Sequence, residues 1–141
     1  MHLTKRLVLL GVLSFAISVK AAEPRPGLWN LSVTTTAEGS DGVFGPYTSS
    51  QCLTEEDVRN PEKLLAQNGA NACTYGDKVY SGGNFSFTVQ CGGTIPMSGS
   101  GRINYTADSL QGTMDIAADL QGLPVNTHST VSGQRVGDCT K

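Results

Sequence analysis

The segment CTYGDKVYSGGNFSFTVQC, from Cys73 to Cys91, predicts a β-hairpin with a cysteine at each end. Its centre, Ser81-Gly82-Gly83, suits a three-residue loop in which Gly83 adopts the left-handed conformation. The facing pairs would then be Cys73 with Cys91, Tyr75 with Val89, Asp77 with Phe87 and Val79 with Phe85. In that register the apolar residues of both arms share one face, which has to pack inside a larger sheet.

The same alternation of apolar and polar residues recurs along the chain between glycine-containing turns. A glycine-rich loop at 37–46 follows the first strand, in which Trp29, Leu31 and Val33 share a face. The expected strands are 28–36, 47–52, the two arms of 73–91, 98–106, 110–120 and 123–136. We therefore predict an all-β fold, an antiparallel up-and-down meander of about seven strands that forms a small barrel or a strongly curved sheet.

One short helical insertion interrupts the strands at about 54–67. Thr54 can cap the amide of Asp57, and the acidic triplet that follows Thr54 suits the positive end of a helix dipole. Pro61 fits the start of a second turn better than the middle of one long helix. The segment therefore predicts a turn at 54–59 and a helix at about 61–67 that ends before Gly69.

Residues 1–21 have the pattern of a cleavable signal peptide, which leaves 22–141 as one domain. Basic residues precede an apolar run at 7–19, and Val19-Lys20-Ala21 places small residues where a signal peptidase cuts. The run is shorter than the roughly 20 residues of a membrane span. No cysteine stands at the cleavage site itself, so we expect an exported periplasmic protein without a membrane anchor.

The charge of the remaining domain argues against nucleic-acid binding. Without Lys5, Arg6 and Lys20, seven Lys and Arg residues face twelve Asp and Glu residues, for a net charge of −5. No basic cluster remains to hold a polyanion. Much of the apolar content also lies in the signal segment, so the domain has a thin core that covalent links would stabilise.

Four cysteines can supply those links, since an even number in an exported chain indicates disulfides. Their spacing contains no Cys-x-x-Cys pair of the kind found in zinc sites, so we expect no bound metal. Two pairings stay open. The hairpin favours Cys73–Cys91, which leaves Cys52–Cys139, and the competing scheme pairs Cys52 with Cys73 and Cys91 with Cys139.

The domain offers little catalytic chemistry, and we expect neither enzymatic activity nor a cofactor. His128 stands beside Ser129 and Thr130, but no glycine-flanked serine of a nucleophile elbow accompanies it, so a hydrolase is the weaker interpretation. Asp115 and Asp119 share the polar face of a strand, where solvated charges are the simpler reading than a cation site.

The apolar face of the sheet is the remaining candidate site. If the sheet closes, its lining is either a packed core or a cleft for a small apolar ligand. The residues expected there are Tyr75, Phe85, Phe87, Val89, Ile103, Tyr105, Met114 and Ile116. The alternative function is that of an envelope interaction or stress protein, whose surface at 54–67 meets a protein partner.

A succession of short motifs resembles a family of small exported bacterial proteins, domain-of-unknown-function family 3617. The motifs are Pro26-Gly-Leu-Trp29, Cys52-Leu-Thr-Glu-Glu, Cys73 and Cys91 around the Ser-Gly-Gly turn, and Ser132-Gly-Gln-Arg-Val-Gly-Asp-Cys139. The resemblance implies a periplasmic protein with four paired cysteines, and it implies no activity.

A second resemblance concerns the first strand. Gly27-Leu28-Trp29 is similar to the Gly-x-Trp of lipocalin-like (calycin) barrels, in which an arginine of the last strand lies over the tryptophan. Arg135 occupies the last strand here, at an odd position like Trp29. The likeness implies that Trp29 closes one end of the barrel beneath Arg135, and a cation over an indole face contributes about 0.5–2 kcal/mol.

Overall fold

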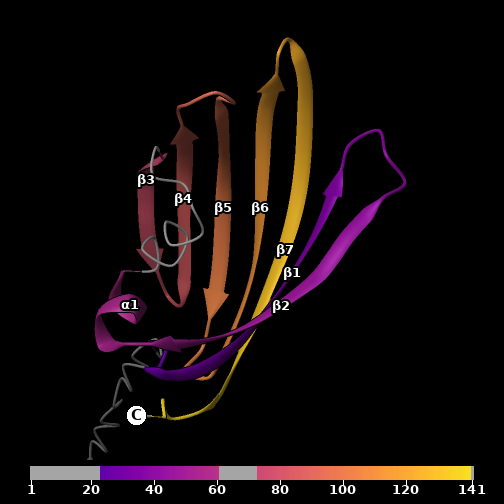
Figure 1. Ribbon diagram of the computed structural model, residues 1–141. Helices are drawn as coiled ribbons and strands as arrows, with labels where there is room; N and C mark the ends of the chain where they lie inside the picture. Colours follow the sequence, from indigo (N-terminus) through magenta and orange to yellow (C-terminus); the bar gives the residue numbers. More distant parts are fainter. Residues whose placement is uncertain (1–22, 61–72, 141) are drawn as a thin grey trace, which may run out of the picture.

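The computed structural model describes residues 23–60 and 73–140, whose seven strands form one antiparallel sheet (Figure 1). The all-β prediction is confirmed. The elements are β1 (Gly27–Ala37), β2 (Val43–Leu53), α1 (Glu55–Arg59), β3 (Cys73–Ser81), β4 (Asn84–Cys91), β5 (Met97–Tyr105), β6 (Ser109–Leu120) and β7 (Leu123–Gly137).

The strand order is β2-β1-β7-β6-β5-β4-β3. From β3 to β7 each strand pairs with the next in sequence, as a meander requires, but β1 pairs with the last strand, β7, and carries β2 at the edge. β2 and β3 do not pair with each other and form the two edges of the sheet. Because every neighbour is antiparallel, the two edge strands β2 and β3 run in the same direction.

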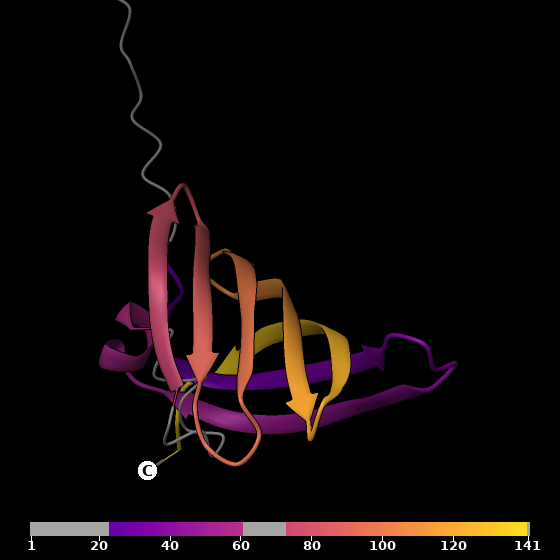
Figure 2. The ribbon, with the colours of Figure 1, turned by 90° about the horizontal axis from the view of Figure 1, so that it is seen from above.

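Of the two predicted shapes, the strongly curved sheet is the one that forms, since the sheet does not close into a barrel. Seen from above, β3, β4, β5 and β6 stand in a row while the β1–β2 hairpin passes across them (Figure 2). The helix α1 follows β2 and lies near β3 in both views. β2 and β3 are therefore the two edges of the curved sheet, and α1 directly follows the edge strand β2.

The sheet has one apolar face and one polar face. The apolar face, which carries Trp29 and Phe85, holds the core. Its buried cluster consists of Phe85, Phe87 and Val89 on the central part of β4, and half-buried neighbours pack against it from β3, β5 and β6. The polar face carries mostly Ser, Thr, Asn and Gln, so alternation along each strand separates core from solvent.

The β3–β4 hairpin keeps the predicted pairing at its cysteine end but not at its loop. Cys73 faces Cys91 and Tyr75 faces Val89. Beyond Gly76 the register shifts, because a bulge at Asp77 and Lys78 adds one residue to β3. The predicted pairs Asp77–Phe87 and Val79–Phe85 are therefore wrong, and Tyr80 faces Phe85 instead.

The extra residue in the bulge is removed from the loop, which is shorter than predicted. Ser81 faces Asn84, so only Gly82 and Gly83 connect the strands, with φ of 56° and 82°. Two consecutive residues with positive φ form the type I′ turn that matches the twist of a hairpin. As a result Tyr80, and not Val79, reaches the apolar face, where its ring stacks on Phe85 with centroids 4.5 Å apart.

Two other expectations concern the edge strand β2 and the helix α1 that follows it. β2 begins at Val43, so it is longer than the predicted 47–52 and takes up part of the expected loop at 37–46. α1 begins after Thr54, whose hydroxyl accepts the Asp57 amide while the Asp57 carboxylate accepts the Thr54 amide. This confirms the predicted cap, whereas the helix expected at about 61–67 lies outside the described residues.

The structure contains the disulfides Cys52–Cys139 and Cys73–Cys91, the first of the two pairings that the sequence allowed. Cys73–Cys91 closes the β3–β4 hairpin. Cys52–Cys139 joins the edge strand β2 to the segment after β7, across β1, which lies between these strands.

No helix within residues 23–60 and 73–140 has the length and apolarity needed to cross a membrane. The predicted signal peptide at 1–21 lies outside the described residues.

Candidate functional site

An apolar cavity of about 690 Å³ lies on the apolar face of the sheet. Side chains from both edge strands line it, including Tyr47 of β2 and Tyr80 of β3, so the sheet curls around the space. The other lining residues are Glu23, Pro24, Trp29, Leu31, Val33, Thr48, Ser49, Gln51, Leu53, Glu55, Asp57, Val58, Arg59, Ile103, Tyr105, Leu110 and Val131. The wall is mainly aliphatic and aromatic, as in pockets that hold small apolar molecules.

Three of the four charged residues of the cavity lining lie on α1, and the fourth lies in the segment before β1. Arg59 donates to the Glu55 carboxylate at 3.3 Å, and the Asp57 carboxylate accepts from Thr54 at the helix cap. Glu23 is the fourth charged residue in the lining. The cavity thus has a long apolar wall and a polar end, an arrangement suited to holding an apolar or amphipathic molecule.

A glycine on β7 shapes the cavity floor. A Cβ at Gly133 would lie 2.7 Å from a Leu110 side-chain carbon and 2.8 Å from one of Leu31. Real side chains do not approach so closely, so only glycine lets these two leucines meet above β7. The contact between Leu31 of β1 and Leu110 of β6 makes one continuous apolar surface in the cavity wall.

The predicted lining divides into two groups. Ile103 and Tyr105 line the cavity. The remaining predicted residues pack against one another in the core cluster on the same face and do not line the cavity; they are Tyr75, Phe85, Phe87, Val89, Met114 and Ile116. β1 and β2 contribute more of the cavity wall than any other strands, and β7 adds Val131. The alternation of Leu31 and Val33 with Trp29 was the sequence signal for it, but only the β1–β7 pairing places these residues beside Leu110 and Val131.

Tyr75 illustrates the character of the packed group. Its ring meets Phe87 edge-on, with centroids 5.8 Å apart. Burial raises the pKa of its hydroxyl above the ordinary value of 10.0, because the phenolate would lose hydration there. The surroundings of Tyr75 on the apolar face therefore disfavour the ionised form of its side chain.

Trp29 is fully buried at the start of β1 and lies across from Arg135 of β7. The Trp29 indole donates to the Arg25 carbonyl at 3.0 Å, and the Arg135 Nε donates to the Pro26 carbonyl at 2.8 Å. Arg135 also forms an ion pair with Asp138. Trp29 and Arg135 are thus neighbours across β1 and β7, and their hydrogen bonds hold the Arg25–Pro26 segment against the end of β7.

Gly27 makes this arrangement possible. Its φ is 146°, and a Cβ there would lie 2.6 Å from the Arg135 Nε. A side chain at this position would therefore displace the guanidinium. Arg25, two residues earlier, pairs with Asp108 in the β5–β6 turn. The segment before β1 is thus bound both to the β5–β6 turn and to strand β7.

His128 and Asp115 face each other across β7 and β6 on the polar face. The His128 Nδ1 lies 2.6 Å from an Asp115 carboxylate oxygen, and both side chains are largely exposed. Ser129 points to the other face, where its hydroxyl bonds to Thr35 at 2.8 Å, so it is no nucleophile for this histidine. Asp119 accepts the Gly122 amide in the β6–β7 turn, away from Asp115.

Among residues 23–60 and 73–140, no three His, Cys, Asp or Glu side chains gather closely enough to hold a metal ion.

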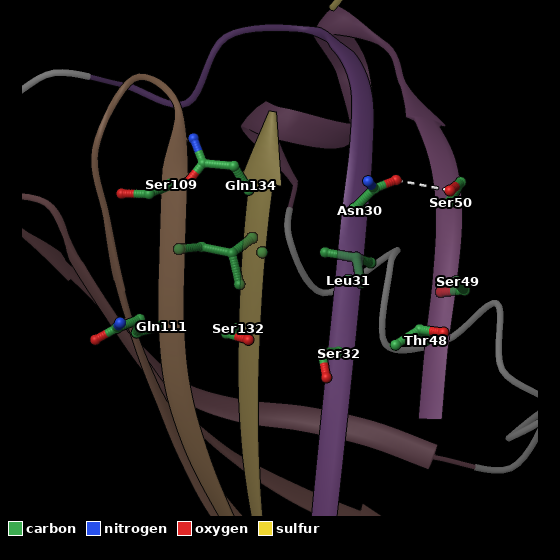
Figure 3. Close-up of a pocket in the computed structure, with 12 residues that line it drawn as sticks. Asn30, Leu31, Ser32, Thr48, Ser49, Ser50, Ser109, Gln111, Ser132 and Gln134 are labelled. Carbon is green, nitrogen blue, oxygen red and sulfur yellow. Dashed lines mark hydrogen bonds between the residues drawn. The ribbon is translucent and has the colours of Figure 1, made fainter. Parts of the chain in front are cut away.

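A second hollow, of about 510 Å³, is lined mainly by side chains of the polar face on four adjacent strands (Figure 3). Asn30 and Ser50 approach each other there, the serine hydroxyl donating to the asparagine oxygen at 2.7 Å. Serines and glutamines of β6 and β7 form the other side. The lining has no charged residue, so this surface offers neutral hydrogen-bonding groups and no acid or base.

The fold and the cavity define a class of protein: a single curved antiparallel sheet, cross-linked by two disulfides, whose apolar face holds a cavity lined by side chains of both edge strands. The chain belongs to the family described as "Protein of unknown function (DUF3617)", whose model matches residues 24–139. This confirms the resemblance carried by the Pro-Gly-Leu-Trp and Gly-Asp-Cys motifs. No curated protein and no solved structure matches the chain.

Proposed function

We propose that the protein is a non-catalytic binding module that holds a small apolar or amphipathic molecule in the cavity beside Trp29. The observation that carries the proposal is the cavity itself, whose volume of about 690 Å³ falls within the 300–1,000 Å³ typical of ligand pockets. Its apolar wall would receive a hydrocarbon part, and its polar end at α1 would receive a head group.

The place of action that we propose is the periplasm. The signal-like pattern of residues 1–21 supports export, and the two disulfides are compatible with an oxidising compartment. A carrier of apolar molecules needs a cavity shielded from water and does not need catalytic residues. The apolar cavity beside Trp29 meets that need.

Trp29 provides a direct test, because it lines the cavity and is the only tryptophan of the chain. Protein purified from the periplasm is expected to carry a co-purifying molecule in native mass spectrometry. After delipidation, the neutral fluorescent probe N-phenyl-1-naphthylamine should bind and quench Trp29 emission.

A matched pair of variants locates the binding. Val131→Phe places a ring in the cavity and should weaken probe binding by about tenfold, which corresponds to about 1.4 kcal/mol. Thr130→Phe makes the same change one residue away on the polar face, where the side chain is exposed, and should leave binding unchanged. Absence of both a co-purifying mass and probe binding would refute the proposal, as would equal effects of the two variants.

A further inference from the structure

The two edges of the sheet differ in how they are protected against pairing with another strand. An edge strand presents unpaired N–H and C=O groups, and proteins usually guard such edges with charges, prolines or bulges. β3 is guarded by its bulge at Asp77 and Lys78, which places two charged residues in the middle of the strand. The Asp77 backbone has a φ of 45°, so the regular ladder stops there.

β2 has no such protection over its second half. No residue of Val43–Leu53 is charged. The irregular part ends at Pro46, and from Tyr47 to Leu53 the strand pairs with β1 without a break in register. This half of the strand is about 20 Å long at roughly 3.4 Å per residue.

The unprotected half of β2 is also accessible. The side chains from Tyr47 to Ser50 are all exposed, and Tyr47 retains 65% of its surface. Ser50 lies on the polar face, where its partner is Asn30 of its own sheet. Among residues 23–60 and 73–140, no strand pairs with the outer edge of β2, and its exposed side chains are mostly small hydroxyl groups that carry no charge.

We propose that the Tyr47–Leu53 half of β2 is the dimerisation edge of this protein and pairs antiparallel with the same segment of a second copy. A strand that pairs with itself across a two-fold axis needs side chains that tolerate their own kind. Serine, threonine and glutamine do so, because each both donates and accepts hydrogen bonds. The chain is acidic overall, and an uncharged seam joins two copies without bringing their carboxylates together.

The pairing is centred near Ser50, and it extends the sheet from one copy into the next. This inference stands apart from the ligand proposal, because it needs the outer edge of β2 and not the cavity.

Sedimentation velocity of the full-length secreted protein, at concentrations from about 1 to about 200 μM, tests the proposal. The wild type should shift from monomer to dimer over this range. Ser50→Lys puts two lysines near each other at the two-fold axis, and like charges facing across strands oppose pairing. The dissociation constant should rise by at least about tenfold.

Thr74→Lys is the matched control, because it adds the same charge to an exposed position on the other edge, β3. It should leave the dimer intact. Thr48→Lys, on the same face of β2 as Ser50, is a second disrupting variant should Ser50→Lys fail to fold, as judged by circular dichroism. Amide hydrogen exchange should show protection of 47–53 that increases with protein concentration.

Three results would overturn the proposal. The first is a wild type that stays monomeric up to the highest concentration. The second is a dimer that withstands both β2 substitutions, and the third is a dimer lost with Thr74→Lys alone, which would place the contact on β3.

Discussion

At the scale of single residues, the close packing of side chains between neighbouring strands explains why glycine occupies some positions at which hydrophobic alternation alone predicts an apolar side chain. Gly101 of β5 occupies an apolar-face position between Phe87 of β4 and Met114 of β6. The far end of the Phe87 ring lies over it, with Cε1 at 2.8 Å from where a Cβ would stand. The glycine therefore creates the space that the buried phenylalanine fills.

Gly101→Val should destabilise the protein by about 1–3 kcal/mol, because the new side chain overlaps the Phe87 ring inside a packed cluster. Urea unfolding measures the change. Gly92→Val is the control, since nothing lies within 4 Å of a Cβ at that position. Its effect should stay within about 0.5 kcal/mol, and equal losses for both variants would contradict the packing argument.

Tyr75 should make stability depend on alkaline pH. Its pKa is raised above 10.0 in the folded state by burial, so above pH 10 the unfolded chain releases this proton first. The contribution is complete below the unfolded pKa and is lost as pH rises through the folded one. In an absorbance titration at 295 nm, Tyr75→Phe should remove a late-titrating phenolate. Loss of an early one instead would contradict the inferred burial.

At the scale of elements, the β3–β4 hairpin shows how far local pattern reaches. Its cysteine ends, its arms and its glycine turn could be predicted from alternation and turn chemistry. Whether the extra residue lies in the loop or in a bulge could not be predicted, because both arrangements place Cys73 opposite Cys91. The Tyr80–Phe85 stack favours the bulged arrangement, and that contact is visible only in three dimensions.

The two disulfides should differ in how much each contributes to the free energy of unfolding. Cys73–Cys91 closes a sequence separation of 18 and Cys52–Cys139 one of 87. In the chain-entropy description these loops correspond to roughly 3 and roughly 4.6 kcal/mol of unfolding free energy. Guanidinium unfolding of the paired Cys→Ala variants should therefore show the larger loss when Cys52 and Cys139 are replaced. The reverse order would mean that the hairpin link holds the sheet together.

At the scale of the whole molecule, the number of strands explains why the sheet stays open. Seven strands whose neighbours are all antiparallel cannot form a ring, because the two edges then run in the same direction. Closure would require a parallel pair between β2 and β3. Among the described strands β2 and β3 are therefore unpaired with each other, and side chains of both line the cavity.

Strand positions, the apolar face, the helix cap and the Pro-Gly-Leu-Trp start were determined by the sequence itself, because alternation, turn residues and capping act over a few neighbours. The tertiary structure alone decided that β1 pairs with β7, which of two disulfide schemes forms and where the cavity lies. Those outcomes depend on contacts between segments as far apart as Trp29 and Arg135. Hydrophobic burial is non-directional, so the pattern of one segment does not specify its distant partner.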